Sequence, residues 1–128
     1  MNKKLRAALT LVMMLASAPA WAEWTRVGAA DDFVTYLDMD TLRKDGAMRR
    51  IWELIDLKEK NPRDGEWSRV VYWEYDCKEN RIKGLQASAY SERMGKGQAI
   101  RTTTTPGPWS FTTPGTVGEI TSHIICAK

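Results

Sequence analysis

The sequence predicts an α+β domain, in which a single antiparallel β-sheet of about six strands, connected as a meander, carries one disulfide-linked C-terminal α-helix. Short runs rich in aromatic and β-branched residues are separated by turn dipeptides, a pattern typical of strands joined by tight turns. Residues 70–77 alternate with a period of two, and a helix-capping pattern opens the last segment. Residues 23–128 are expected to form one domain, because 106 residues enclose one modest core but not two.

Residues 1–22 have the pattern of a secretory signal peptide. Three basic residues precede an apolar run over residues 7–18, and Ala20-x-Ala22 supplies the small residues that signal peptidase requires. The run is too short to span a bilayer comfortably, so we expect cleavage between Ala22 and Glu23 and no membrane span afterwards. No cysteine follows the cleavage site to carry a lipid, which predicts a periplasmic or secreted protein.

The first half of the mature chain is expected to form paired strands. Residues 23–29 and 33–38 are rich in aromatic and β-branched side chains and are separated by a short acidic turn. We expect residues 39–44 to form a single turn of helix. The turn dipeptide Asp45-Gly46 then leads into a strand over residues 47–57.

The middle of the chain has the clearest strand signal. Val71, Trp73 and Tyr75 alternate with more polar neighbours, so they should face inward, with Cys77 on the same face. Two further strands complete the meander, over residues 81–90 and 98–103. The threonine-rich and proline-rich stretch that follows is expected to be a loop.

The last segment is expected to be a helix. Thr116 and Glu119 form a capping box, in which the threonine side chain can accept a hydrogen bond from the glutamate amide. Val117, Ile120 and Ile124 form one apolar stripe, which we expect to lie on the inner face of the sheet.

Cys77 and Cys126 are the only two cysteines, and in an exported chain we expect them to form a disulfide. Closing a loop of about 50 residues contributes about 4 kcal/mol in the chain-entropy account. In an ideal helix Cys126 points away from the apolar stripe, so the last helical turn is expected to unwind to reach Cys77. The alternative is two unpaired, buried thiols.

Several short motifs resemble one known family. They are Tyr36-x-Asp38, Trp52, Glu74-Tyr75-Asp76-Cys77, Pro108-Trp109 and the terminal Cys126. In their order and spacing the mature chain resembles the surface-adhesin protein E-like family of small exported proteins of Gram-negative bacteria. The resemblance implies one antiparallel sheet tied to a C-terminal helix by Cys77 and Cys126. For the adhesin that names the family, it also implies binding to host proteins at the cell surface.

Charge predicts the kind of partner. Loss of Lys3, Lys4 and Arg6 with the signal reduces the 19 basic residues to 16, equal to the 16 acidic ones, so the basic pI is no evidence for nucleic acid. Residues 78–101 nevertheless hold six Lys and Arg against two acidic residues. Within this segment Arg81 and Lys83 share one strand face and could attract an acidic protein or polyanion, or could be an ordinary solvated face.

Five tryptophans remain in the mature chain, a high load for its size. Trp67 and Trp109 stand beside turns and are candidates for exposed contact residues. The other three, Trp24, Trp52 and Trp73, are expected to be mostly in the core, because large aromatic side chains bury the most area.

The residues that carry catalysis or bind metals are sparse. His123 is the single histidine, so no nucleophile–base pair and no histidine-rich metal site can be assembled around it. Asp38, Asp40 and Asp45 suggest calcium, but the EF-hand spacing is absent and a strand end followed by a turn explains them. We therefore expect no enzyme, no metal and no cofactor.

The leading hypothesis is an exported, non-catalytic binding protein that recognises a protein through its sheet edge or its basic hairpin. One alternative is a periplasmic inhibitor or modulator of an envelope enzyme, for example lysozyme. Another is a structural component of the envelope with no separate ligand. The binding hypotheses predict an exposed concave or aromatic surface, and the structural hypothesis predicts none.

Overall fold

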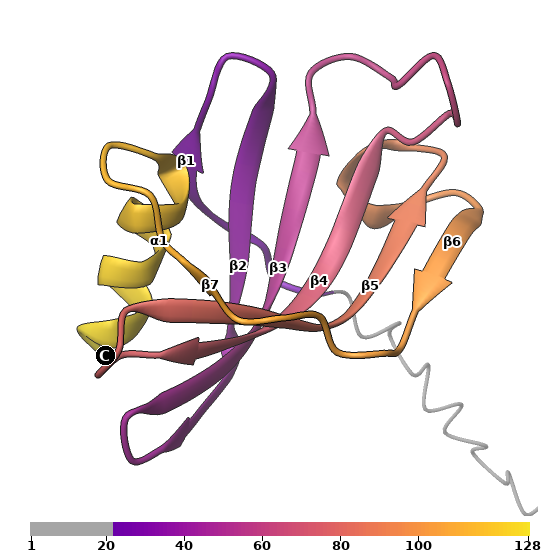
Figure 1. The fold of residues 1–128 in the computed structure, drawn as a ribbon. Helices are drawn as coiled ribbons and strands as arrows, with labels where there is room; N and C mark the ends of the chain where they lie inside the picture. The colour runs from indigo at the N-terminus through magenta and orange to yellow at the C-terminus, as the bar shows by residue number, and fades with distance from the viewer. Residues whose placement is uncertain (1–21) are drawn as a thin grey trace, which may run out of the picture.

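A computed structural model describes residues 22–128, so the predicted signal peptide lies outside the described residues except for Ala22. The chain forms one antiparallel sheet with the order β1-β2-β3-β4-β5-β6, and a short β7 pairs with the start of β5 (Figure 1). The strands are β1 Thr25–Ala29, β2 Phe33–Asp45, β3 Met48–Leu57, β4 Ser68–Asp76, β5 Arg81–Tyr90, β6 Ala99–Thr103 and β7 Ser110–Phe111. The predicted meander and the α+β class are confirmed, whereas β7, which follows the stretch expected to be a loop, was not predicted.

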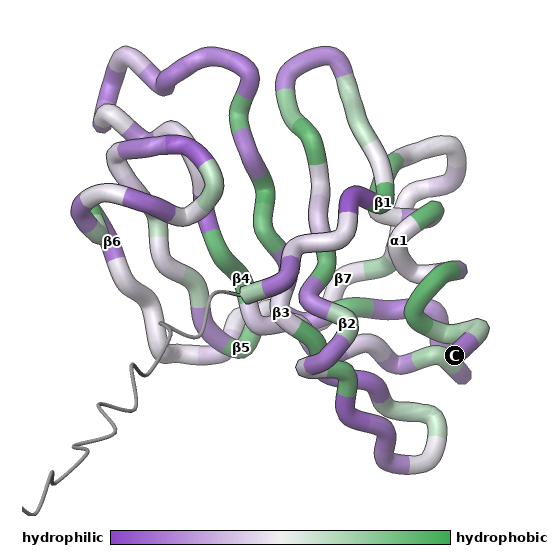
Figure 2. Tube along the Cα trace, turned by 180° about the vertical axis from the view of Figure 1, so that it is seen from behind, coloured by the Kyte–Doolittle hydropathy of each residue, from purple (hydrophilic) through white to green (hydrophobic). Residues whose placement is uncertain are grey.

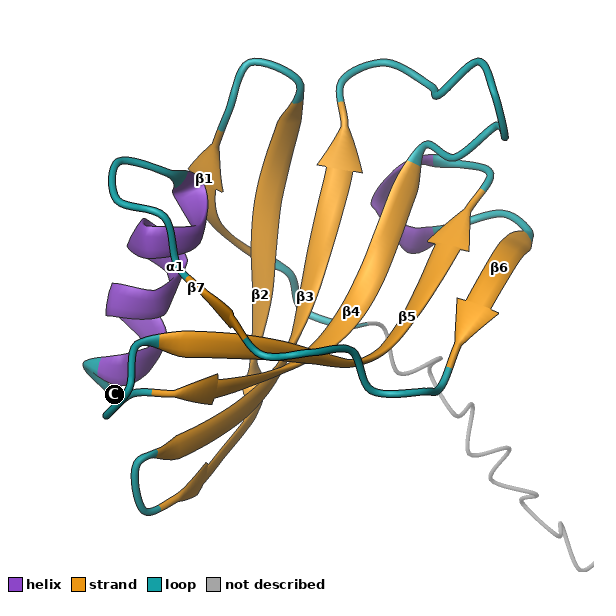
Figure 3. Cartoon of the chain, in the orientation of Figure 1, coloured by secondary structure: helices purple, strands orange, loops and turns teal. Residues whose placement is uncertain are grey.

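Within residues 22–128, helical structure is confined to two short elements, drawn in purple in Figure 3. They are the 3₁₀ turn η1, Arg93–Gly95, and the C-terminal helix α1, Val117–Cys126. Thr116 caps α1, because its side chain accepts a hydrogen bond from the amide of Glu119 as the capping pattern predicts. No helix among residues 22–128 is long and apolar enough to cross a membrane.

The helical turn expected over residues 39–44 is wrong, because β2 continues to Asp45 through an irregularity between Asp38 and Arg43. The hydroxyl of Thr41 donates to the carbonyl of Asp38 at 2.7 Å and accepts from the amide of Trp52 at 3.1 Å. This side chain replaces the regular backbone pairing at the irregularity, so the strand bends without ending. The long β2–β3 hairpin turns at Gly46, whose φ of 57° suits glycine.

The two faces of the sheet are covered differently. The front face in Figure 1 carries α1 at one side and is crossed by the segment that leads from β6 to α1. The core lies under α1, where Leu37, Ile51, Tyr75 and Ile125 are buried together. The inward orientation expected for Val71 and Tyr75 is confirmed, since both are buried. The back face carries η1 over its upper end, and much of the rest lies open (Figures 1 and 2).

Helix α1 contacts the sheet with two of the three residues of the expected stripe, because Ile124 packs against the core and Val117 lies against Gly28. Ile120 of the predicted stripe is 50% exposed, whereas Ile125 and Thr121 are fully buried. The hydroxyl of Thr121 donates to the carbonyl of Val117 at 2.9 Å, which allows a polar side chain on the buried side.

The disulfide between Cys77 and Cys126 is confirmed, with 5.7 Å between the two Cα atoms. The expected unwinding of the last turn is wrong, because Cys126 is the last residue of α1 and reaches Cys77, the residue after β4, without leaving the helix. The bridge ties the end of the helix to the core, where Ile125 is buried, whereas Ile120 is exposed.

Candidate binding surfaces

Trp109 is held between two cations of β5. The Cζ atom of Arg81 and the Nζ atom of Lys83 each lie 4.5 Å from the centre of its ring, within the range of a cation–π interaction. Trp109 precedes β7, and β7 pairs with Arg81 and Ile82, so this pairing brings the tryptophan beside the start of β5. Three of the residues proposed from the sequence thus form one cluster, called here the Trp109 cluster.

The two cations of the Trp109 cluster are also paired with acidic side chains of β4. Nε of Arg81 donates to Oδ2 of Asp76 at 3.0 Å, and Nζ of Lys83 lies 3.5 Å from Oε1 of Glu74. Amide hydrogen bonds, first from Glu79, and the Arg81 guanidinium hold the pKa of Asp76 below its usual value. Because both carboxylates are almost buried, they hold the cations in place and compensate much of their charge.

A row of charged residues continues from the Trp109 cluster across the sheet. The strand register places Arg43, Arg50, Glu74 and Lys83 next to one another on β2 to β5. Nε of Arg50 donates to Oε2 of Glu74 at 2.6 Å, which raises the pKa of Arg50. The sequence analysis missed Arg43 and Arg50, because only the cross-strand register brings them beside Lys83. Pairing the residues of the two strands on either side of the Asp45-Gly46 turn would have placed Arg50 opposite Arg43 from the sequence alone.

Trp67 does not belong to the Trp109 cluster. It precedes β4, whereas Trp109 lies beside the opposite end of that strand. Nζ of Lys60 and Cζ of Arg93 lie 5.6 Å and 5.8 Å from the centre of its ring. Its Nε1 is buried without a hydrogen-bond partner among the described residues. Trp67 is therefore a separate, half-buried site, and no sequence pattern distinguished it from Trp109.

The expectation that Trp24, Trp52 and Trp73 lie mostly in the core is wrong, because each of these side chains is only partly buried. The small core under α1 is filled by aliphatic side chains and Tyr75, and it covers only part of one face. Trp73 packs at the margin of this core. Trp52 lies on the back face, where its ring stacks on Tyr72 with 4.9 Å between the ring centres.

The back face contains a hollow of about 370 Å³, called here the back-face hollow. Its walls include two tryptophans and a tyrosine, and its polar groups come from β2 and β5. The lining residues are Ala22, Trp24, Asp38, Thr41, Trp52, Val70, Ser88 and Tyr90. The sequence analysis did not predict this site, because its residues come from five separate segments of the chain.

A second hollow, of about 460 Å³, lies on the front face beneath the segment that includes Gly107 and Pro108. Trp73 forms part of its wall, and Nε1 of Trp73 donates to Oε1 of Glu53 at 3.0 Å. Burial raises the pKa of Glu53 to about 7, although this hydrogen bond favours the charged form. Burial, with the nearby charge of Glu53, also raises the pKa of Tyr75.

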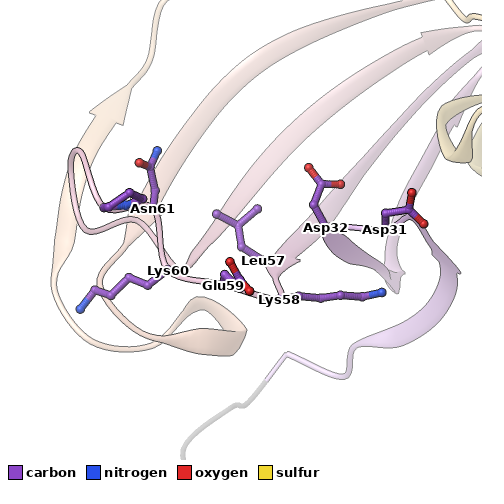
Figure 4. A pocket seen from close by; sticks show the side chains of 8 residues that line it. Asp31, Asp32, Leu57, Lys58, Glu59, Lys60 and Asn61 are labelled. Atoms are coloured by element: carbon purple, nitrogen blue, oxygen red, sulfur yellow. The ribbon is translucent and has the colours of Figure 1, made fainter.

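A third hollow, of about 540 Å³, is a gap between the β1–β2 turn and the segment after β3. Figure 4 shows the side chains of Asp31, Asp32, Lys58 and Lys60 spread apart. The turn expected around Asp31 and Asp32 is confirmed. Because these charged groups do not converge on one point, the gap has the character of a solvated surface rather than a ligand site.

The residues considered for metal binding do not come together. Among residues 22–128, no three His, Cys, Asp or Glu side chains are grouped so that they could hold a metal ion. Asp38 and Asp40 lie within β2, the first almost buried and the second exposed. Asp45 is the exposed last residue of β2, directly before the turn at Gly46, so the expected strand end and turn are confirmed for Asp45. His123 is exposed on α1.

The outer edge of the sheet is the last candidate surface. All five residues of β6 are exposed, and β6 pairs with β5 on one side only among the described strands. Ile100 is one of three large hydrophobic residues exposed in the described part of the chain. The edge that was expected to take part in binding is therefore accessible.

Comparison with known proteins identifies relatives of this chain. The family model described as surface-adhesin protein E matches residues 24–127. A solved structure of Haemophilus influenzae protein E aligns with a TM-score of 0.58 at 17% identity, covering 79% of this chain and 91% of that one. Protein E from non-typeable H. influenzae aligns with a TM-score of 0.59 at 18% identity, covering 85% and 80%. At these identities the structures establish a shared fold. No curated protein sequence matches.

Proposed function

Because this chain belongs to the surface-adhesin protein E family, as the match over residues 24–127 establishes, we propose that it is an exported, non-catalytic protein that binds a protein partner at the cell envelope. Export requires removal of residues 1–22 by cleavage between Ala22 and Glu23. The disulfide supports this proposal, because such bonds persist in oxidising compartments outside the cytoplasm. With no cysteine after the cleavage site, the mature protein is periplasmic or secreted.

The observation that carries the proposed contact is the Trp109 cluster. Tryptophan and arginine are the residues most enriched where binding energy concentrates in protein interfaces. Arg81 and Lys83 are already held beside Trp109 by the carboxylates beneath them, so little side-chain entropy is lost when a partner binds. The cations lie nearer the solvent than their carboxylates, and they therefore face an acidic partner first.

A capture experiment followed by binding kinetics tests this function. Mature protein is used to capture partners from host matrix proteins and from envelope extracts, and the captured partner is then measured at two salt concentrations. Trp109→Ala and Lys83→Gln should weaken binding, and salt should slow association. Charge reversal at Lys83 is avoided, because a new carboxylate beside Glu74 would destabilise the fold.

The matched control is Lys78→Gln, which removes an exposed cation from the same basic segment but outside the cluster. Thermal unfolding of each variant verifies that the fold is retained. If the partner binds Trp109→Ala and Lys83→Gln as tightly as wild type, and its association rate ignores salt, the contact lies elsewhere, with Trp67 and the β6 edge as the next surfaces to test. If no partner is captured at all, the binding function itself is refuted.

A further inference from the structure

Six carboxylates of the described chain are almost buried, and five of them have a donor. Each of these five carboxylates accepts a hydrogen bond from another residue. The pairs are Glu53 with the indole of Trp73, Asp56 with the backbone amide of Met94, Glu66 with Arg69, Glu74 with Arg50, and Asp76 with Arg81. The sixth is Asp38, which is 8% exposed. Buried charges in proteins are normally paired or hydrogen-bonded, so an exception calls for a physical reason.

The surroundings of Asp38 supply no partner for its carboxylate. The hydroxyl of Thr41 donates to the backbone carbonyl of Asp38 and not to its side chain. No hydrogen bond or ion pair reaches the carboxylate from residues 22–128. The carboxylate lines the back-face hollow, beside the ring of Trp52, which is its cross-strand neighbour.

The cations of the same face are engaged or lie outside the hollow. The Arg43 guanidinium donates to the carbonyls of Asp40 and Leu42, and Arg50 is paired with Glu74. Arg26 is placed on this face by its pairing with Tyr36, but it does not line the hollow. The proposed cleavage would remove Ala22 from the wall of the hollow and create an α-amino group at Glu23, next to Trp24. No side chain of residues 22–128 neutralises the hollow.

The walls of the hollow indicate which ligand would do so. Trp24, Trp52 and Tyr90 line it, and the faces of aromatic rings attract organic cations, most strongly when a carboxylate is also present. An inorganic cation would need several oxygen ligands, whereas Asp38 is the single carboxylate of the hollow. A neutral sugar would leave the charge of Asp38 uncompensated. A volume of about 370 Å³ suits a small group.

We propose that the back-face hollow binds an organic ammonium group, with Asp38 as its counter-ion and Trp24, Trp52 and Tyr90 as its aromatic walls. The ammonium group belongs to a small quaternary amine or to a lysine side chain, which share this chemistry. The site is separate from the Trp109 cluster and does not depend on the function proposed for that cluster.

Titration of the isotopically labelled protein with choline, followed through the indole N–H signals in NMR spectra, tests the proposal. Choline should move the signals of Trp24 and Trp52 in a saturable way and leave that of Trp109 unchanged. 3,3-Dimethylbutanol, which has the shape of choline without its charge, should bind at least about tenfold more weakly. Acetyl-lysine methylamide, which keeps a free side-chain ammonium, distinguishes a lysine side chain from a small quaternary amine as the ligand. Tighter binding than choline favours lysine, and weaker binding favours the quaternary amine.

Asp38→Asn keeps the shape of the side chain and removes its charge. This variant should bind choline about tenfold more weakly and 3,3-dimethylbutanol as wild type does. The matched control is Asp40→Asn, an exposed carboxylate of the same strand, which should change neither. The proposal is overturned if neither cation shows saturable binding, if choline and its neutral analogue bind equally, or if Asp38→Asn binds choline as tightly as wild type.

Discussion

Replacing Glu53 by glutamine should change how stability depends on pH. Glu53 lies among buried side chains of β3, and its Oε1 accepts a hydrogen bond from Trp73 at 3.0 Å. Burial raises its pKa from 4.5 to about 7. Glutamine has nearly the same shape and keeps an oxygen acceptor for the indole N–H, so the substitution removes the titration and little else.

The sign follows from proton linkage. Between the unfolded pKa near 4.5 and the folded pKa near 7, the folded state binds more protons at Glu53 than the unfolded state does. Ionisation of Glu53 therefore lowers the free energy of unfolding as pH rises through this window, and the loss is complete above it. The rise of this pKa from 4.5 to about 7 corresponds to about 3 kcal/mol. Carboxylates with lowered pKa, such as Asp76, act in the opposite direction.

Urea denaturation of wild type and Glu53→Gln at several pH values from 4 to 8 measures this effect. The difference between the two proteins isolates Glu53, because every other titrating group is common to both. The variant should gain stability relative to wild type as pH rises from about 5 to about 7.5, by about 2 to 3 kcal/mol. A difference that stays constant over this range would refute the argument and would mean that Glu53 is solvated or paired.

Three further predictions concern processing, the disulfide and the helix. The intact mass of the exported protein should correspond to a chain that begins at Glu23, and a mass that retains residues 1–22 would contradict it. Cys77→Ala should lower the free energy of unfolding by about 2 to 4 kcal/mol, and mass spectrometry of non-reduced peptides should recover the bridge from wild type. Ile125→Ala should lower the free energy of unfolding, measured by urea denaturation, by about 2 to 5 kcal/mol, because this side chain is fully buried. Ile120→Ala should lower it by less than about 1 kcal/mol, because half of this side chain is exposed. Equal losses for the two variants would show that α1 packs on the sheet with a different side.

Local patterns were sufficient for the elements whose signal lies within one segment. The alternation through Val71 and Tyr75 predicted β4 and its buried face, and the Thr116 capping pattern predicted the start of α1. Residues 39–44 were misassigned because a bulged strand has no clean period of two. There the Thr41 hydroxyl supplies hydrogen bonds that a regular strand takes from its neighbour's backbone.

The orientation of α1 depends partly on contacts distant in sequence. Apolar periodicity was right for Val117, which lies against Gly28, and for Ile124, which packs against the core, but it was wrong for Ile120, which is exposed. A Cβ atom at Gly28 would come within 3.0 Å of Val117, so the glycine allows this close approach. The disulfide from Cys126 to Cys77 ties the end of this ten-residue helix to the sheet, a contact that periodicity does not include.

The two candidate sites differ in how far the sequence could reveal them. Arg81 and Lys83 are two residues apart on one strand, so their shared face was predictable, and only the return of Trp109 through β7 was not. In the sequence, nothing distinguishes Asp38 from Asp40 and Asp45, the other aspartates of its segment. Its distinction is that the other almost buried carboxylates of the described chain have donors and it has none, which emerges only when every partner in the fold is assigned. The oxygens of Asp38 are not among the fully enclosed atoms that lack a partner, so they are accessible from the back-face hollow, where a cationic ligand can reach them.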